Sequence, residues 1–218
     1  MKTISPIAFF RSPLTSKFGV PRQSGVVDEL RGIIVLEPEY NRPEAIRGLE
    51  DFDFLWLIWG FSAIRSSEKL TVRPPRLGGN IRVGVFASRS PFRPNRLGLS
   101  SVRIVRIAPE GIHVAGADLM DGTPIFDIKP YLPSVDSHPS ARGGFTDSHA
   151  WSLLRVEIPE NYRRLFSETD ARALEAILKN DPRPSYQQDA GRVYGMPFVG
   201  RDIQFRVEDG LLTVVDVV

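Results

Sequence analysis

Cysteine is absent from this chain. Its absence excludes a disulfide framework, a thiolate nucleophile and a zinc site built on cysteine. Histidine is scarce as well, and His113, His138 and His149 lack the spacing of metal ligands. We therefore expect no metal site. If the chain is an enzyme, its reactive group has to come from other side chains or from an organic cofactor.

Long hydrophobic runs and nucleotide-binding glycine motifs are also missing. The longest apolar stretch, Phe54–Phe61, is far shorter than the roughly 20 residues that a membrane-spanning helix needs. No apolar segment of the kind found in secretory signals precedes Pro13, so a cytoplasmic protein without membrane contact is predicted. No G-x-G-x-x-G fingerprint, G-x-x-x-x-G-K loop or G-x-S-x-G elbow occurs. These absences leave a binding protein, or an enzyme whose reactive group a cofactor supplies.

Lysine is rare among the basic residues, since 23 of the 28 are arginine. The net charge of +2 hides an uneven distribution. Between Arg65 and Arg106, nine arginines and Lys69 stand against one acid, Glu68, so this segment carries +9 and the rest of the chain −7. A basic segment in a nearly neutral protein is typical of one that binds nucleic acid. Ion pairs with acids elsewhere in the fold explain the charges equally well until the motifs are considered.

Hydrophobic residues in the first 150 positions follow the two-residue period of β-strands, and Pro/Gly turns separate them. Many short strands at regular spacing favour a barrel or sandwich over a wound α/β sheet. Residues 42–49 predict one short helix. The predicted strands are Ile4–Phe10, Gly32–Leu36, Phe54–Phe61, Ile81–Ala87, Ser100–Ile107, Ile112–Ala117 and Pro124–Ile128.

The last third of the chain has a different pattern. Residues 133–148 are rich in Ser, Pro, Gly, Asp and His and predict a long loop. A strand is expected over Trp151–Ile158, one helix over Pro159–Leu178, and a hairpin over Ile203–Val217 with an Asp-Gly turn. The sequence thus predicts a mainly β protein, with an N-terminal all-β barrel over residues 1–150 and a small C-terminal α+β domain over residues 151–218.

Four stretches dense in Gly, Pro and polar residues lie beside the predicted strands: Val20–Gln23, Val72–Asn80, Ser88–Gly98 and Asp118–Pro124. Proline fixes φ, so such loops present arginine side chains and backbone groups in an ordered arrangement before a ligand arrives. Well-formed turns have a similar composition. The concentration of these loops around one basic segment favours a binding site.

Together these stretches resemble the TrmO (YaeB-like) family of tRNA methyltransferases. Matching segments occur in the family's order over nearly the whole chain: Thr71–Asn80, Gly84–Asn95, Asp121–Pro124, Asp127–Pro133 and Asp181–Tyr186. The resemblance implies an enzyme that uses S-adenosylmethionine to methylate N6 of threonylcarbamoyladenosine beside the tRNA anticodon. It also implies that an all-β barrel holds the cofactor and that the protein is a homodimer.

The resemblance further implies which residues contact the cofactor. These are Pro21, Arg22, Gln23, Ser62, Ala63, Arg89, Leu99, Asp118, Leu119, Met120 and Asp121. Some family members have His-Gln where this chain has Ser62-Ala63. Small side chains cannot form the same hydrogen bonds, so contact at this pair is expected through the backbone.

The acceptor N6 bears a carbamoyl group that delocalises its lone pair, so transfer requires a general base or a polarising group. Asp181 and Asp127 are the candidate bases, with Tyr186 as orienter or proton relay. Arg183 is a candidate for binding the threonyl carboxylate or a phosphate through its two-pronged guanidinium. Without the resemblance, Asp181 is a helix-end turn residue before Pro182, a common use of aspartate.

The arginine-rich loops are then expected to face tRNA. Arg73, Arg76, Arg93 and Arg96 are the candidates for phosphate contacts, and Phe92 either stacks on an unpaired base or is buried. Two alternatives stay open: a non-catalytic β-barrel that binds RNA, and a methyltransferase of the same family with another substrate. The general base, the dimer geometry and the sharing of a site between subunits are open as well.

Overall fold

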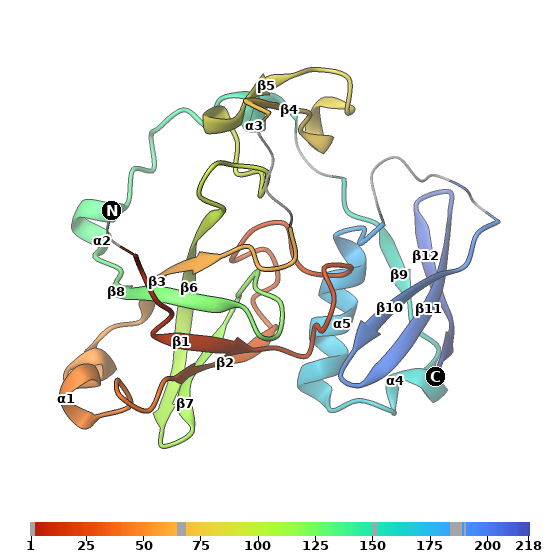
Figure 1. Ribbon diagram of the computed structural model, residues 1–218. Coiled ribbons are helices and arrows are strands. Elements are labelled where there is room, and N and C mark those ends of the chain that lie inside the picture. Colours follow the sequence, from red (N-terminus) through yellow and green to blue (C-terminus); the bar gives the residue numbers. More distant parts are fainter. Residues whose placement is uncertain (1–2, 65–68, 150–151, 184–188, 190) are drawn as a thin grey trace.

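The computed structural model describes residues 3–64, 69–149, 152–183, 189 and 191–218. The larger part of the protein is a closed antiparallel barrel (Figure 1). Around the barrel the strands follow the order β1 (Ala8–Arg11), β2 (Arg31–Leu36), β7 (Gly111–Ala115), β6 (Leu97–Ala108), β3 (Phe54–Gly60) and β8 (Pro124–Pro130). The prediction of an all-β barrel is confirmed.

Burial alternates along the barrel strands as the sequence pattern predicts. In β3, Leu55, Leu57 and Trp59 face the interior, where they join Phe10 and Ile125 in one buried cluster. Each large apolar side chain contributes roughly 1.5–3 kcal/mol when it is buried. A shift of one residue would turn all of these side chains outward, so this burial fixes the register.

Two predicted strands of the first half differ from expectation. Strand β1 begins at Ala8 rather than Ile4, because Pro6 lacks the N–H that a ladder position needs. Residues 81–87 do not form one strand. Instead β5 (Val83–Gly84) pairs with β4 (Thr71–Val72), and Val85–Ala87 form a 3-10 turn. Their apolar side chains do not all face a core, since Phe86 is 78% exposed.

Two other segments contain more or less helix than expected. The helix predicted over residues 42–49 is the short α1 (Pro43–Ile46). The predicted long loop holds two helical turns, α2 (Pro133–Asp136) and α3 (Phe145–Ser148). Hydrogen bonds from the Leu132 amide (2.8 Å) and the Trp56 indole (2.9 Å) lower the pKa of Asp136 and anchor α2 to the barrel.

The C-terminal part is a sheet in the order β10 (Tyr194–Phe198), β11 (Arg201–Glu208), β12 (Leu211–Val217) and β9 (Arg155–Glu157), with β9 parallel to β12. The predicted β11–β12 hairpin is present. Its turn residues Asp209 and Gly210 have φ of 47° and 73°, as a type I′ turn requires. The strand predicted over Trp151–Ile158 is the shorter β9. Trp151 itself lies outside the described residues. Strand β10 was not predicted.

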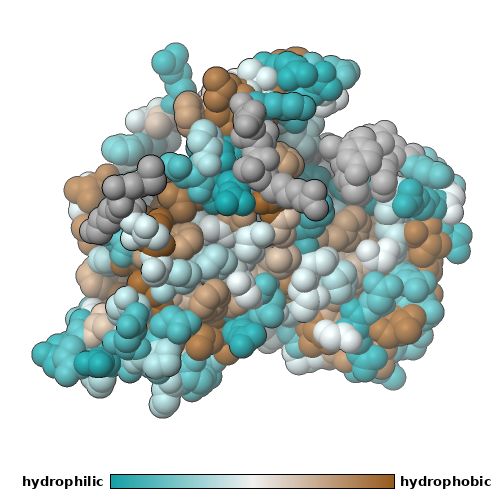
Figure 2. Space-filling model, in the orientation of Figure 1, coloured by the Kyte–Doolittle hydropathy of each residue, from teal (hydrophilic) through white to brown (hydrophobic). Residues whose placement is uncertain are grey.

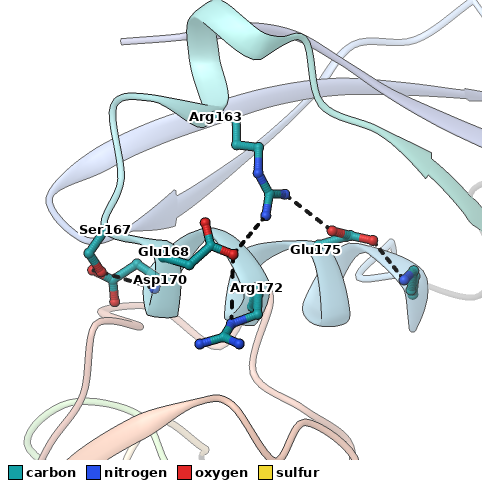
Figure 3. A network of polar contacts seen from close by, with 7 residues as sticks. Arg163, Ser167, Glu168, Asp170, Arg172 and Glu175 are labelled. Atoms are coloured by element: carbon teal, nitrogen blue, oxygen red, sulfur yellow. Dashed lines mark hydrogen bonds and ion pairs between the residues drawn. The ribbon is translucent and has the colours of Figure 1, made fainter.

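The helix predicted over residues 159–178 is two helices, α4 (Glu160–Arg163) and α5 (Glu168–Lys179). The break arises because Ser167 caps α5, its hydroxyl accepting a hydrogen bond from the Asp170 amide at 3.1 Å. Arg163 then joins the two helices through Glu168 and Glu175, both at 3.3 Å (Figure 3). None of the helices in the described ranges is long and apolar enough to cross a membrane.

The chain between β1 and β2 leaves the barrel and packs beside α5 and the C-terminal sheet (Figure 1). Leu14, Val27 and Leu30 of this segment belong to the same buried cluster as the apolar face of α5. Gly19 has φ of 89°, and a Cβ there would lie 2.3 Å from Met196 Sδ, so the close approach requires glycine. The loop Val20–Gln23, which follows Gly19, is therefore positioned by the C-terminal part of the protein.

Candidate active site

A pocket of about 450 Å³ opens where β3 ends and β6 begins. This volume falls within the roughly 300–1,000 Å³ of small-molecule sites. Loops far apart in the sequence meet there, because the antiparallel barrel brings these strand ends together. The predicted cofactor residues that line it are Pro21, Arg22, Gln23, Ser62, Ala63, Arg89, Leu99, Asp118 and Met120.

Two predicted cofactor residues are not among those that line the pocket. Leu119 is fully buried in the barrel core. The Asp121 carboxylate accepts a hydrogen bond from the Ser12 amide at 3.0 Å and lies 3.8 Å from the Arg11 guanidinium. Leu119 therefore packs into the barrel core, and Asp121 holds the start of the segment that follows β1.

A buried polar chain forms part of the pocket wall. The Trp59 indole donates to Ser100 Oγ at 2.9 Å, and Ser100 donates in turn to the Asp118 carboxylate. Burial raises the pKa of Asp118, and the opposing hydrogen bonds from Ser100 and from backbone amides, with the charge of Arg89, only reduce this effect. A desolvated carboxylate in an aromatic pocket is suited to a cationic ligand or to a hydroxyl donor.

Glycine allows the wall to be this tight. A Cβ on Gly98 would lie 2.3 Å from the Trp59 ring, so only glycine lets β6 pass the indole at this point. Ser100 follows two positions later on the same face of the strand. The two small residues together make room for the indole and its hydrogen bond.

Arginine side chains fix the loops at the pocket mouth. Arg89 donates to the Gln23 side chain at 2.6 Å and so joins two of the predicted cofactor loops. Arg93 donates to the Ser88 carbonyl at 3.1 Å within its own loop. Arg96 donates to the Ile64 carbonyl at 3.1 Å and braces the loop that carries the predicted Ser-Ala pair.

A second cavity of about 210 Å³ adjoins the first. The two share one wall, formed by Lys17 and Val20–Gln23. Ile177 and Asn180–Pro182, at the end of α5, form the far side. Arg22 reaches across and donates to the Asp181 carbonyl at 3.2 Å, so barrel loop and C-terminal part meet within a single chain.

Asp181 and Arg183 of the predicted catalytic set are in direct contact. The guanidinium of Arg183 binds both carboxylate oxygens of Asp181, with Nε–Oδ1 at 2.8 Å and Nη2–Oδ2 at 2.9 Å. Asp181 has φ of 49°, an uncommon conformation that aspartate and asparagine tolerate best. Asp127 lines neither cavity and pairs with Lys129 at 3.0 Å. Tyr186 lies outside the described residues.

The predicted tRNA arginines separate into different environments. Arg73 is exposed and makes no hydrogen bond or ion pair within the described part of the chain. Arg76 lines the second cavity, whereas Arg93 and Arg96 hold backbone carbonyls. Phe92 is 47% exposed, so the interpretation of this residue as buried is wrong.

Sequence reasoning missed several residues of the site. Lys17 lines both cavities, and Trp59, Ser100 and Gly98 build the wall of the larger one. Gly98 and Ser100, two small residues two positions apart on a hydrophobic strand, were a usable signal that a large side chain packs there. No such signal pointed to Lys17, because nothing in its local sequence shows that residues 12–30 leave the barrel.

Comparison with known proteins agrees with this architecture. The family model of the tRNA-methyltransferase O N-terminal domain matches residues 9–137, and that of the TrmO C-terminal domain matches residues 153–218. The chain belongs to the TrmO family. Its predicted membership and fold class are thereby confirmed.

Individual TrmO relatives match over nearly their full length. An Escherichia coli protein named tRNA (adenine(37)-N6)-methyltransferase is 37% identical and covers 93% of this chain and 92% of its own. A Pseudomonas aeruginosa relative, RcsF, bears the name of an S-adenosylmethionine-dependent methyltransferase; it is 39% identical, with coverage of 99% and 97%. A TrmO crystal structure from Pseudomonas aeruginosa superposes with a TM-score of 0.81 at 32% identity, covering 100% of this chain and 99% of that one.

Proposed function

We propose that this TrmO-family chain transfers a methyl group from S-adenosylmethionine to N6 of threonylcarbamoyladenosine, next to the anticodon of tRNA. The observation that carries the proposal is the pair of adjoining cavities. One gathers nine of the residues expected to hold the methyl donor, and the other contains Asp181. Relatives from Escherichia coli and Eikenella corrodens are named tRNA (adenine(37)-N6)-methyltransferase.

The larger pocket suits the chemistry of S-adenosylmethionine. Trp59, Phe61 and Leu99 offer apolar surface for a flat purine ring. The Asp118 carboxylate complements a positive charge, and Arg89 at the mouth complements the carboxylate of an amino-acid group. When bound, the cofactor supplies an already activated methyl group. The contribution of the protein is then mainly to align donor and acceptor.

Asp181 is the general base that this arrangement favours. It lines the cavity next to the donor pocket, whereas Asp127 lines neither cavity. Among the described residues, Oδ1 of Asp181 accepts from the backbone and the Nε of Arg183, whereas Oδ2 accepts from Nη2 alone. A carboxylate oxygen has two lone-pair directions, so Oδ2 retains one acceptor site for the N6 proton. Arg183 then holds the base in place, and a direct contact of its guanidinium with substrate is not needed.

The outer loops offer a surface for tRNA. Between Lys69 and Ala108 the sequence contains no acidic residue, and Arg73 and Arg82 are exposed there. Phe86 and Phe92, 78% and 47% exposed, add aromatic faces on which unpaired bases can stack. Figure 2 shows hydrophilic and hydrophobic atoms side by side above the barrel, where Figure 1 places β4 and β5.

We also propose that the protein works as a homodimer in the cytoplasm. The dimer follows from the family resemblance, and the location from the presence of tRNA and methyl donor in that compartment. Sedimentation equilibrium tests the dimer. A mass equal to one 24.4 kDa chain at micromolar concentration would contradict it.

A methyl-transfer assay with the purified protein tests the reaction. Two forms of one tRNA, with and without the threonylcarbamoyl group, are incubated with labelled S-adenosylmethionine and digested for mass spectrometry. We expect one added methyl on the threonylcarbamoyl nucleoside and none on plain adenosine. Calorimetry separates the enzyme from a non-catalytic RNA-binding barrel, since the latter would bind RNA but not S-adenosylmethionine.

A further inference from the structure

The smaller cavity carries more positive charge than its one carboxylate balances, and one of its cations, Arg76, does not line the donor pocket. Lys17, Arg22 and Arg76 line it, and Asp181 is the single acid among the described residues of its lining. The carboxylate of Asp181 is already bound on both oxygens by Arg183, which is not part of the lining. The cavity therefore presents more positive than negative charge to whatever enters it.

Two of the cations are close enough to repel each other. Partial burial lowers the pKa of the Arg22 guanidinium, the charge of Asp181 raises it, and the charge of Arg76 lowers it again. Arg22 is also fixed in direction, because it donates to the Asp181 carbonyl at 3.2 Å. Like charges held together at a cavity wall favour an anionic ligand, which removes their repulsion.

Lys17 stands at the junction of the two cavities. It lines both of them, and within the described ranges its ammonium group makes no hydrogen bond or ion pair. Its backbone is held in place by two neighbours, since Leu14 is fully buried and Gly19 packs on Met196. An anchored backbone with an unengaged ammonium group is suited to receive a carboxylate or a phosphate oxygen.

We propose that the smaller cavity binds the carboxylate of the amino-acid group attached to the acceptor base, with Lys17, Arg22 and Arg76 as its cationic walls. This inference rests on the proposed function. The acceptor nitrogen must lie near the methyl group in the larger pocket, and its substituent must then extend into the adjoining space. Arg183 cannot offer its full fork to this carboxylate while it binds Asp181, so the lining cations take that role.

A binding experiment with two RNAs tests the cavity. The first is an anticodon stem-loop with threonylcarbamoyladenosine, and the second differs only in a primary amide that replaces the threonyl carboxylate. Fluorescence anisotropy at one salt concentration compares the protein, the variant Lys17→Gln and the control Lys179→Gln. Lys179 lies on α5, where its ammonium pairs with Glu175 at 2.7 Å, and it lines neither cavity.

We expect the unmodified protein and Lys179→Gln to bind the carboxylate RNA about tenfold more tightly than the amide RNA, and Lys17→Gln to lose most of this preference. Equal affinity of the unmodified protein for both RNAs would overturn the proposal. Equal losses on both RNAs for Lys17→Gln would assign Lys17 to a phosphate of the RNA backbone and overturn it as well. A preference for the carboxylate RNA without methyl transfer to it would contradict the proposed reaction while supporting the cavity.

Discussion

The two cavities share a wall but are built in different ways. The larger one is lined mostly by the barrel and its loops, with aromatic side chains and a buried carboxylate. The smaller one lies where the barrel loop meets the end of α5, and its lining sets Lys17, Arg22, Arg76 and Asp181 among mostly apolar residues. The difference indicates separate roles for the two cavities. Under the proposed function, the described lining places the cofactor against the barrel and its loops, whereas the acceptor side includes the end of α5 as well.

This division has a structural cause. Residues 12–30 pack into the C-terminal core and carry Lys17 and Arg22 to the shared wall. Changes in the barrel pocket should therefore alter cofactor binding, and changes at the end of α5 should alter methyl transfer. The predictions that follow test whether these two effects can be separated.

The largest expected effect comes from Asp181→Asn. Asparagine tolerates the positive φ at this position and keeps the shape of the side chain, but it cannot take a proton. We expect methyl transfer to fall about 10²- to 10⁴-fold, the usual contribution of a general base, with S-adenosylmethionine affinity unchanged. Single-turnover rates and calorimetry measure the two quantities. A normal rate for Asp181→Asn with a collapsed rate for Asp127→Asn would reverse their roles.

The next effect is on the donor side. Asp118→Asn should weaken S-adenosylmethionine binding at least about tenfold, because it removes a desolvated charge, while tRNA affinity stays the same. Calorimetry for the cofactor and anisotropy for tRNA check the separation. If both affinities fell together, the two cavities would not be independent sites.

The same residue predicts a pH dependence. Burial raises the pKa of Asp118, so affinity for a cationic cofactor should decrease as pH falls through this raised value. The fold favours the protonated form, so this carboxylate reduces the stability of the protein as pH rises above its ordinary titration range. Asp118→Asn should remove both dependences. Calorimetric titrations at several pH values, with melting curves alongside, measure them.

Gly98→Ala tests the packing of the barrel wall. The new Cβ would meet the Trp59 ring at 2.3 Å, and overpacking of this kind costs about 1–3 kcal/mol. Gly84→Ala is the matched control, since a Cβ there has nothing within 4 Å and its φ is −59°. Urea unfolding compares the two variants. Equal stability would show that the indole moves aside without cost.

The smallest effect concerns the outer arginines. Arg73→Ala should weaken tRNA binding and reduce the slope of affinity against salt by about one, as the loss of one phosphate contact does. Arg96→Ala should instead disturb the loop it braces through Ile64 and so weaken cofactor binding. Salt titrations of both variants distinguish the roles. An unchanged slope for Arg73→Ala would remove it from the RNA surface.

Local sequence patterns predicted much of the fold. The alternation around Leu55 and Leu57, and the Asp209-Gly210 turn, acted as expected because burial and turn geometry are set by a few neighbouring residues. The single long helix was wrong because the Ser167 cap was overlooked, although its Ser-x-x-Asp pattern was visible.

The site was less predictable for a physical reason. The family motifs identified nine residues that line the larger pocket. That Lys17 and Trp59 line it as well is known only from the structure. Lys17 depends on a segment that leaves one core for another, and the Trp59–Ser100–Asp118 chain joins strands far apart in the sequence. Gly98 and Ser100 were the one local signal of this packing, because their small side chains leave space for the Trp59 ring, but they do not show which residue fills it.

Mass spectrometry of tRNA nucleosides from cells that lack this protein tests the central claim most directly. Deletion should abolish the methylated threonylcarbamoyl nucleoside and leave its unmethylated form at a higher level. Expression of the intact chain should restore the methylated nucleoside, and expression of Asp181→Asn should not. An unchanged amount of the methylated nucleoside in the deletion cells would contradict the account.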